Sequence, residues 1–413
     1  MGADLTRQIA EKYRDRLTET LDRLHRMPEL SRQEHETSRF IAGYLRELGI
    51  GITDIGQETG VVGILNGAKP GPCVALRCDI DALPVTETSS NPVHSENPGV
   101  MHACGHDMHI TSLLGAASVL AELKNEIRGS VKFIFQPAEE INYGAQHMIS
   151  CGVLEDPRVD AVYSLHNSPE IPTGTVAVKR GPIMAGLFTI IIKVHGKGGH
   201  GGIPHRNIDP VVCSAAIIQN LQTIVSRNVS PTDSGVISIC SIHTPGAAVS
   251  NVVPDSVEMH GTVRFYREET GKMMEERIRA VLEHTAAAYG CTAELSVIQN
   301  MPATDNRPLP GQADLYPIAL DCVKAIGAIA ADPEPSGGAD DFAYYRIGHD
   351  GHSGVPSFFY WLGIRNEALD CIYSWHSPNY RVDPDAAVIG AALLAESAIQ
   401  TGYRLTPTRP ISI

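Results

Sequence analysis

The sequence predicts an α/β protein with a mixed sheet, interrupted by a smaller α+β segment. Two observations support this fold class. Short apolar runs alternate with amphipathic helical patterns over residues 60–167 and again after Pro302, as in layered α/β folds. Between these regions, residues 187–299 follow the order β-α-β-β-α-β, which is typical of a small ferredoxin-like domain with helices on one face of an antiparallel sheet.

The main domain is expected to consist of residues 1–184 and 301–413, around an inserted domain of residues 185–300. Residues 5–48 have the pattern of two amphipathic helices separated at Pro28, because proline cannot continue a helix. The other elements are short apolar strands and longer segments with helical spacing. The strands are residues 60–65, 73–80, 131–136, 161–167 and 357–362, and the helices are residues 109–124, 313–329 and 384–401.

The inserted domain shows the clearest periodicity. Apolar residues alternate with mostly polar neighbours along residues 256–265, which is the period of a strand with one buried face. Met274, Ile278 and Leu282 lie on one face of the following helix. The expected strands are residues 187–194, 235–242, 256–265 and 292–299, and the expected helices are residues 208–227 and 268–289.

Composition excludes several classes of partner. Lys plus Arg number 33 and Asp plus Glu number 47, which gives a net charge of −14. Nucleic acid and anionic membrane surfaces require a basic face, so neither is expected as a partner. The longest apolar run, residues 187–194, is far shorter than the ~20 residues that span a bilayer. The nine scattered cysteines form no CxxC pair, which favours a reducing compartment and a cytoplasmic location.

The stretch "MHACGHDMH" is the first candidate site. Cys104 and His106 are separated by one residue, so a thiolate and an imidazole can converge on one cation. Both groups are good ligands for zinc, manganese, cobalt or nickel. The alternative is a histidine-rich helix cap with a buried cysteine, and this stretch alone does not separate the two interpretations.

Further ligand types follow other expected strands. Glu139 and Glu140 end "FQPAEE", and His166 and His376 lie in "SLHN" and "YSWHSPNY". Each is more simply a structural residue when taken alone: the paired acids suit a helix start, and a single histidine is usually hydrogen-bonded. In an α/β fold, however, strand ends meet at one edge of the sheet, so their joint occurrence favours one metal site. Two more strand-end carboxylates, Asp79 and Asp81, could orient a ligating imidazole.

A longer series of motifs carries a family resemblance. The series is "RCDIDALPVTE", "MHACGHDMH", "FQPAEE", "HNSPEIPTG", "GKGGHGGIPHRNIDP", "SNVVPD", "GTVR", "DDFAYY" and "WHSPNY". It resembles the aminoacylase–carboxypeptidase family of co-catalytic metallohydrolases. Within that family it is most similar to the amidohydrolase branch that contains hippurate hydrolase and the plant auxin–amino-acid conjugate hydrolases. The resemblance extends from about residue 20 to about residue 400.

The resemblance implies roles for the residues of the main domain. Two divalent metal ions, of manganese, zinc, cobalt or nickel, would be held by five ligands. Glu139 falls on the general base, which takes a proton from a metal-activated water. The implied ligands are Cys104, His106, Glu140, His166 and His376.

The resemblance also implies roles for the inserted domain, which matches the lid and dimerisation domain of the family. His200 falls on a lid histidine that reaches an active site, in relatives often that of the partner subunit. Asn251 and Arg264 fall on positions that contact the substrate, including its carboxylate. A homodimer or a higher homo-oligomer is therefore expected.

The expected function is metal-dependent hydrolysis of a C–N bond in a small carboxylate-bearing molecule, such as an N-acyl amino acid. One departure concerns the substrate: relatives carry Ser and Glu where this chain has Ala339 and Asp340. This change and the aromatic residues near His376 keep open a deaminase that releases ammonia from an electron-poor aromatic amino carboxylate. A non-catalytic binding protein and a thiol enzyme that uses Cys104 are further alternatives.

Overall fold

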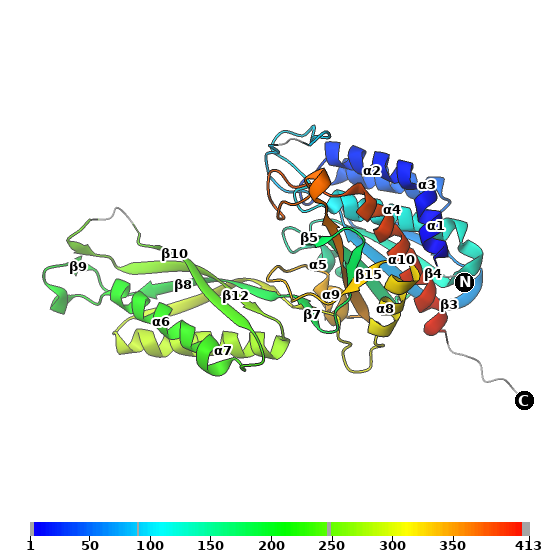
Figure 1. The fold of residues 1–413 in the computed structure, drawn as a ribbon. Coiled ribbons are helices and arrows are strands. Elements are labelled where there is room, and N and C mark those ends of the chain that lie inside the picture. Colours follow the sequence, from blue (N-terminus) through cyan, green and yellow to red (C-terminus); the bar gives the residue numbers. More distant parts are fainter. Residues whose placement is uncertain (1–3, 89–90, 246–248, 407–413) are drawn as a thin grey trace, which may run out of the picture. The chain divides into compact units, whose positions relative to one another are not determined.

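The computed structural model describes residues 4–88, 91–245 and 249–406 (Figure 1). Contacts between these residues divide the chain into two compact units. The first unit lies within Met1–Gly181, Asp305–Glu334 and Asp341–Ile413, and the second within Pro182–Thr304 and Pro335–Asp340. The expected insertion, residues 185–300, falls in the second unit. Its role as a lid and dimerisation domain stays a prediction.

The first unit contains a mixed eight-stranded sheet in the order β1-β2-β4-β3-β5-β18-β6-β15. The four central strands, β4, β3, β5 and β18, are parallel, whereas β2 is antiparallel to β4 and β6 is antiparallel to β18. The mixed α/β sheet expected from the sequence is thereby confirmed. The strands are β1 (Gly51–Thr53), β2 (Val61–Asn66), β3 (Lys69–Asp79), β4 (Arg128–Gln136), β5 (Ala161–Pro172), β6 (Thr175–Ala177), β15 (Ile329–Ala331) and β18 (Ser357–Arg365).

Helices pack on this sheet because its central strands are apolar on both faces. Helices α4 and α10 are mostly buried, and Figure 1 shows them beside α1 and α2, with which they are in contact. The helices of the first unit are α1 (Leu5–Lys12), α2 (Arg14–Arg26), α3 (His35–Glu47), α4 (His106–Glu122), α5 (Gly144–Ser150), α8 (Tyr316–Ala325), α9 (Ala343–Ile347) and α10 (Pro384–Arg404).

The expected helices of this unit have different bounds in the structure. Residues 5–48 form three helices and not two, because the helical conformation is interrupted at Tyr13 as well as near Pro28. The helix expected over residues 109–124 begins earlier, at His106, directly after Gly105. The helix expected over residues 313–329 is shorter and covers Tyr316–Ala325. Gly327 has a φ of 70°, which is not helical, and residues 329–331 form a strand that pairs with β6.

The second unit has the expected β-α-β-β-α-β order. Its antiparallel sheet has the strand order β10-β12-β8-β13, and α6 and α7 pack on one face of it (Figure 1). Burial alternates strictly along β12, as the sequence predicted. The elements are β8 (Gly186–His195), α6 (Pro210–Asn228), β10 (Gly235–His243), β12 (Ser256–Phe265), α7 (Glu268–Ala288) and β13 (Thr292–Met301).

Short elements complete the described chain. They are the strands β7 (Pro182–Met184), β9 (Gly199–His200), β11 (Val252–Val253), β14 (Thr304–Asp305), β16 (Gly348–His349) and β17 (His352–Ser353), and the 3-10 turns Lys124–Glu126, Pro204–Arg206 and Glu367–Leu369. In the part of the chain that the structure describes, no helix combines the length and apolarity needed to cross a membrane.

Candidate metal centre and active site

The sheet of the first unit brings the candidate ligands together. Strands β3, β4 and β5 are parallel neighbours, so their carboxyl ends lie at one edge. Asp79 ends β3, and Glu139 and Glu140 follow β4. His166 lies in the middle of β5, two residues beyond Ser164, which pairs with Arg77 near the end of β3. Side chains that are distant in the sequence therefore face one region of the first unit.

A glycine turn fixes the segment that carries the thiol. Gly105 has a φ of 81°, in the left-handed region that favours glycine. A Cβ atom at this position would lie 2.5 Å from the side-chain nitrogen of Asn167. The turn places Cys104 just before helix α4 and His106 as its first residue.

The five predicted ligands form two overlapping groups of donor atoms. Atoms of Cys104, His106 and His166 all lie within 4.8 Å of one another, as do atoms of Cys104, Glu140 and His376. The Cys104 Sγ is 3.5 Å from His166 Nε2. Glu140 bridges two imidazoles, with Oε1 at 3.7 Å from His106 Nε2 and Oε2 at 3.8 Å from His376 Nε2.

Two of the imidazoles are held so that one nitrogen faces this cluster. The Nδ1–H of His106 donates to the carbonyl oxygen of Asp81 at 2.8 Å, and that of His166 donates to the carbonyl oxygen of Asn167 at 2.8 Å. A carbonyl oxygen can only accept, so in each ring Nδ1 carries a proton. Such an arrangement fixes the orientation of a metal-ligating histidine.

The donor atoms fit divalent metal ions. His106 Nε2 and Glu140 Oε1 are buried and have no hydrogen-bond partner within the described chain. Buried polar atoms are nearly always partnered, so the two atoms indicate that something polar binds between them. Thiolate, imidazole and carboxylate together form the ligand set of zinc and related transition metals.

The electrostatics of the cluster also favour a cation. Burial raises the pKa of the Glu140 carboxyl to about 7, and the charges of Asp81 and Asp79 add to this shift while His106 opposes it. Burial raises the pKa of the Cys104 thiol well above its usual value. An activated thiol nucleophile has a lowered pKa, so these surroundings do not suit the thiol-enzyme alternative. A bound cation would stabilise both the thiolate and the carboxylate.

His376 reaches the cluster from a separate loop. Its backbone N–H donates to the carbonyl oxygen of Ala103 at 2.8 Å, which ties this loop to the segment before Cys104. Its φ is 64°, a conformation that is uncommon for a residue with a side chain and that recurs at functional sites. Burial and the charge of His106 lower the pKa of His376, which favours the neutral form that can bind a metal.

Asp81 positions both glutamates. Its carboxylate accepts the backbone N–H groups of Glu139 at 3.1 Å and Glu140 at 3.0 Å, and the Ser31 hydroxyl at 2.7 Å. Glu139 is 7% exposed, and one of its oxygens lies within 4.8 Å of donor atoms of His106 and Glu140. The predicted base thus lies beside the predicted ligands.

A second histidine of "MHACGHDMH" has a role that the sequence did not assign. The Nδ1–H of His109 donates to Asp79 at 2.5 Å, and its Nε2 accepts the backbone N–H of Asn167 at 3.0 Å. Asp79 also accepts from the buried guanidinium of Arg77 at 3.0 Å, and Arg77 donates to Asp341 at 2.8 Å. This buried network of charged groups connects β3 to helix α4, which begins with the proposed ligand His106. The three-residue spacing of His106 and His109 on one helix was the available signal for it.

Asn167 is a further residue that sequence reasoning missed. Its side-chain amide donates to the Cys104 carbonyl at 2.7 Å. Its side-chain oxygen accepts from the hydroxyl of Tyr380 and from the indole N–H of Trp375. Trp375 also stands near His166, with 6.0 Å between ring centroids. Asn167 therefore joins β5 to the loops that carry Cys104 and His376.

The residues predicted in the lid lie in the second unit. His200 is exposed, and its Nδ1 accepts the backbone N–H of Gly202 at 2.9 Å, so Nε2 carries the proton. None of the described residues accepts a hydrogen bond from this Nε2–H. Asn251 directly precedes β11, and its carbonyl oxygen accepts the backbone N–H of Gly201 at 2.8 Å. Asp340 is buried in this unit, and its carbonyl accepts from the Thr304 hydroxyl.

Arg264 projects from β12 of the second unit. Its guanidinium donates to the carbonyl oxygens of Gly337 at 3.2 Å and Val263 at 3.2 Å, and to the Thr262 hydroxyl. No carboxylate of the described residues lies within ion-pair distance of it. Such a guanidinium retains the capacity to bind an anion.

Fold and site together define the class of the protein. A mixed α/β sheet that gathers thiol, imidazole and carboxylate groups beside a buried glutamate defines a metal-dependent hydrolase. Residues 75–400 match the family model of peptidase family M20/M25/M40, and the chain belongs to this family. It is accordingly a hydrolase of amide C–N bonds.

Two relatives are similar to this chain over most of its length. The chain is 39% identical over 394 residues to N-acetylcysteine deacetylase of Bacillus subtilis, covering 95% of this chain and 98% of the relative. It is 37% identical over 384 residues to IAA-amino acid hydrolase ILR1-like 2 of Arabidopsis thaliana, covering 92% and 83%. These relatives are named for removing or releasing an acyl group, so they do not favour the deaminase alternative.

A solved structure shows the same architecture. The crystal structure of the YXEP protein of Bacillus subtilis, a dinuclear metal-binding peptidase of the M20 family, has a TM-score of 0.82 and 35% sequence identity. The match covers 95% of this chain and 99% of that chain. The resemblance expected from the motifs is confirmed.

Proposed function

We propose that this protein is a metal-dependent amidohydrolase that removes the acyl group from N-acyl amino acids. The cluster of donor atoms at the edge of the first unit's sheet carries this proposal. Two of its buried atoms, His106 Nε2 and Glu140 Oε1, have no hydrogen-bond partner within the described chain, and a cation would bind both. Two divalent ions would be held there, as the dinuclear relative supports. The five proposed ligands are Cys104, His106, Glu140, His166 and His376.

Divalent ions at such a centre polarise a carbonyl group and lower the pKa of a water. Glu139 is the proposed proton carrier, since its carboxylate lies beside the ligands without being needed among them. It would take a proton from water and deliver it to the leaving amine. Asp81, through its bonds to both backbone N–H groups, keeps Glu139 and Glu140 in fixed relative positions.

The second unit is proposed to act on the substrate. His200, with a free Nε2–H, would donate to the oxyanion that forms at the scissile carbonyl. Arg264 would bind the carboxylate of the amino acid through its guanidinium, with Asn251 as a further polar contact. These roles are supported by the family resemblance and by the hydrogen-bonding state of each side chain.

Three broader features belong to the same proposal. The metal is manganese, zinc, cobalt or nickel, which the mixed thiol, imidazole and carboxylate donors accept. The protein works in the cytoplasm, in agreement with nine cysteines that form no disulfide among the described residues. It assembles as a homodimer or a higher homo-oligomer through its second unit.

A substrate panel tests the proposed function. The purified protein is incubated with N-acetyl, N-benzoyl and indole-acetyl derivatives of several amino acids, and with an aminobenzoate series. Released amino acid and ammonia are measured separately. We expect free amino acid from the acylated substrates and no ammonia from the aromatic amines. Ammonia without acyl release would contradict the proposal.

A further inference from the structure

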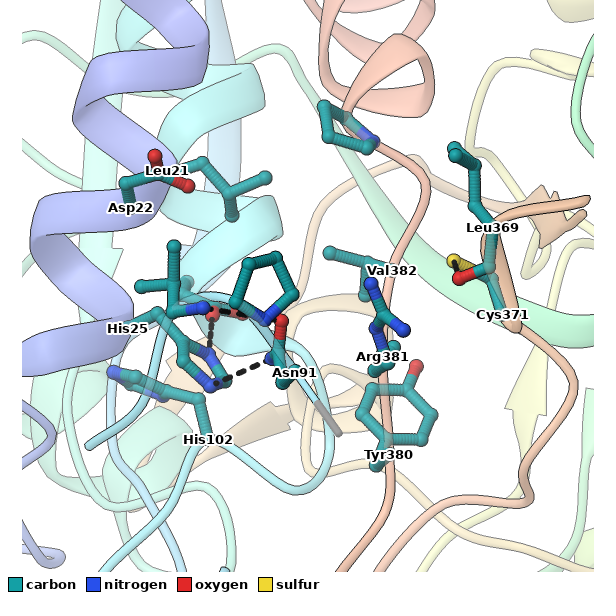
Figure 2. Close-up of a pocket in the computed structure, with 14 residues that line it drawn as sticks. Leu21, Asp22, His25, Asn91, His102, Leu369, Cys371, Tyr380, Arg381 and Val382 are labelled. Carbon is teal, nitrogen blue, oxygen red and sulfur yellow. Dashed lines mark hydrogen bonds and ion pairs between the residues drawn. The ribbon is translucent and has the colours of Figure 1, made fainter. Parts of the chain in front are cut away.

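A cavity lies in the first unit, beside the segment that carries Cys104 and His106. It has a volume of about 220 Å³ and is lined by residues of α2, of residues 91–93, of the segment around α4 and of the loop before α10 (Figure 2). His102 and Asp107, which flank the two proposed ligands in sequence, belong to its wall. None of the five proposed metal ligands lines it.

His102 is a buried polar group without a partner. The residue is 1% exposed, and neither of its ring nitrogens has a hydrogen-bond partner within the described chain. A neutral imidazole offers one donor and one acceptor to a ligand. A buried ring of this kind indicates a site that a polar ligand completes.

Asp107 already has a charged partner within the protein. His25 contacts Asp107 through Nδ1 at 2.7 Å and Glu87 through Nε2 at 3.4 Å. The side chain of Asn91 lies 3.4 Å from the same Nε2 (Figure 2). A ligand in the cavity therefore meets this cluster as a closed network and not as a free acid.

Two other charged residues of the wall are free to bind. Asp22 comes from α2 and Arg381 from the loop before α10, and Figure 2 shows them on different walls of the cavity. Neither residue forms an ion pair with another described residue. The cavity thus presents one unpaired acid and one unpaired guanidinium, which suits a ligand that carries both charges.

The remaining wall is apolar and sets the size of the ligand. Leu21, Val93, Leu369 and Val382 line the space between the charged groups. The cavity has a volume of about 220 Å³. This volume is below the usual size of drug-binding pockets and suits a small amphiphilic molecule.

We propose that this cavity binds a free aliphatic α-amino acid. Arg381 binds its carboxylate, Asp22 binds its ammonium group, and the aliphatic side chain lies among Leu21, Leu369 and Val382, while His102 offers a further hydrogen bond. The inference goes beyond the proposed function: free amino acids are the class of product which that reaction releases, but the binding requires no turnover. The ligand would contact the wall next to the proposed metal-binding segment, at His102.

The test is calorimetric titration of the full-length, metal-loaded protein with L-leucine. Two analogues serve as probes of each charge: 4-methylpentanoate lacks the ammonium group, and 3-methylbutylamine lacks the carboxylate. We expect leucine to bind at least tenfold more tightly than either analogue. Equal binding of 4-methylpentanoate and leucine would overturn the assignment of an amino acid, and so would the absence of any leucine binding.

Variants locate the binding site. Arg381→Met and Asp22→Asn should each weaken leucine binding at least tenfold, and Arg381→Lys should weaken it less. Leu369→Trp, at a position that is 42% exposed, fills the cavity from its edge and should also abolish binding. Arg158→Met, at an exposed position outside the cavity, is the matched control and should bind as the wild type does.

A last variant separates this cavity from the metal centre. His376→Ala removes a proposed metal ligand, so it should abolish acyl release and leave leucine binding intact. Loss of leucine binding in this variant would place the ligand at the metal centre and overturn the inference. The proposed function is judged by acyl release alone, so the two proposals can fail independently.

Discussion

The carboxylate of Asp81 accepts the backbone N–H of Glu139 at 3.1 Å, which holds the proposed base at the end of β4. The same carboxylate accepts the backbone N–H of Glu140 at 3.0 Å. Asp81 is buried, and burial would raise its pKa, but hydrogen bonding to His106 and the charge of His106 outweigh burial and lower it. The Asp81 carboxyl is therefore ionised. It links the proposed base Glu139, the proposed ligand Glu140 and the imidazole of His106.

Replacement of Asp81 by alanine should impair the site without removing a ligand. Two buried N–H groups would lose their acceptor, which costs roughly 1–3 kcal/mol each in the free energy of unfolding. Metal affinity should fall about 10–100-fold, as for other residues that orient metal ligands. Metal titration and chemical denaturation measure the two effects. Ser31→Ala, which removes only one donor to Asp81, is the control and should have a smaller effect on both.

The adjacent glutamates should respond differently to the same substitution. Glu139→Gln removes the proposed base and should lower kcat by about 10²–10⁴-fold while metal content stays unchanged. Glu140→Gln removes a proposed ligand and should lower metal content first. Metal analysis beside steady-state kinetics separates them. Equal loss of metal in both variants would contradict the division of roles.

His200→Ala should lower kcat by about 10²–10³-fold with little change in KM, because an oxyanion donor acts mainly in the transition state. In a dimer whose His200 serves the partner's site, this variant and Glu139→Gln should complement each other. An equimolar mixture would then regain about a quarter of wild-type activity, since half of the dimers are mixed and each has one complete site. No recovery on mixing would show that His200 does not act across subunits.

The buried His25 makes stability depend on pH. Burial lowers the pKa of His25, but hydrogen bonds to Asp107 and Glu87 outweigh it and raise the pKa from 6.5 to about 10. The folded state thus favours the protonated ring. The resulting stabilisation is fully present below pH 6.5 and is lost as the pH rises through about 10.

His25→Ala should accordingly destabilise the protein by roughly 3–5 kcal/mol at pH 6, as when one partner of a buried ion pair is removed. The difference from wild type should shrink towards pH 10. Urea denaturation at a series of pH values measures it. The exposed His35 provides the matched variant, His35→Ala, which should show no such pH dependence. A constant difference across the pH range would be inconsistent with a charged His25.

Much of this site could be predicted because its residues follow a simple rule of α/β folds. Cys104 directly precedes the turn into α4 and Glu140 follows β4, and His166 lies in β5 where the neighbouring strand β3 ends. Parallel strands bring such positions together at one edge of the sheet. The strands of the second unit were predictable for a similar reason, since burial alternates along β12 with the period of its apolar residues.

Residues that depend on tertiary contacts could not be found in this way. Arg77 and Asp341 form a buried ion pair across 264 residues of sequence, and no local pattern marks such a pair. The start of α4 at His106 depends on Gly105, which has a left-handed conformation and lies close to the side chain of Asn167 in β5. Asn167 itself is an ordinary polar residue in the sequence, and only the fold brings its side chain to Cys104, His109, Trp375 and Tyr380.

The most direct test is the metal content of the purified protein, measured by mass spectrometry together with acyl release from an N-acetyl amino acid before and after chelation. We expect about two divalent ions per chain. Both the ions and the activity should be lost on chelation and should return when the metal is restored. Full acyl release by a metal-free protein would contradict the account, because Cys104, His106, Glu140, His166 and His376 would then serve another purpose.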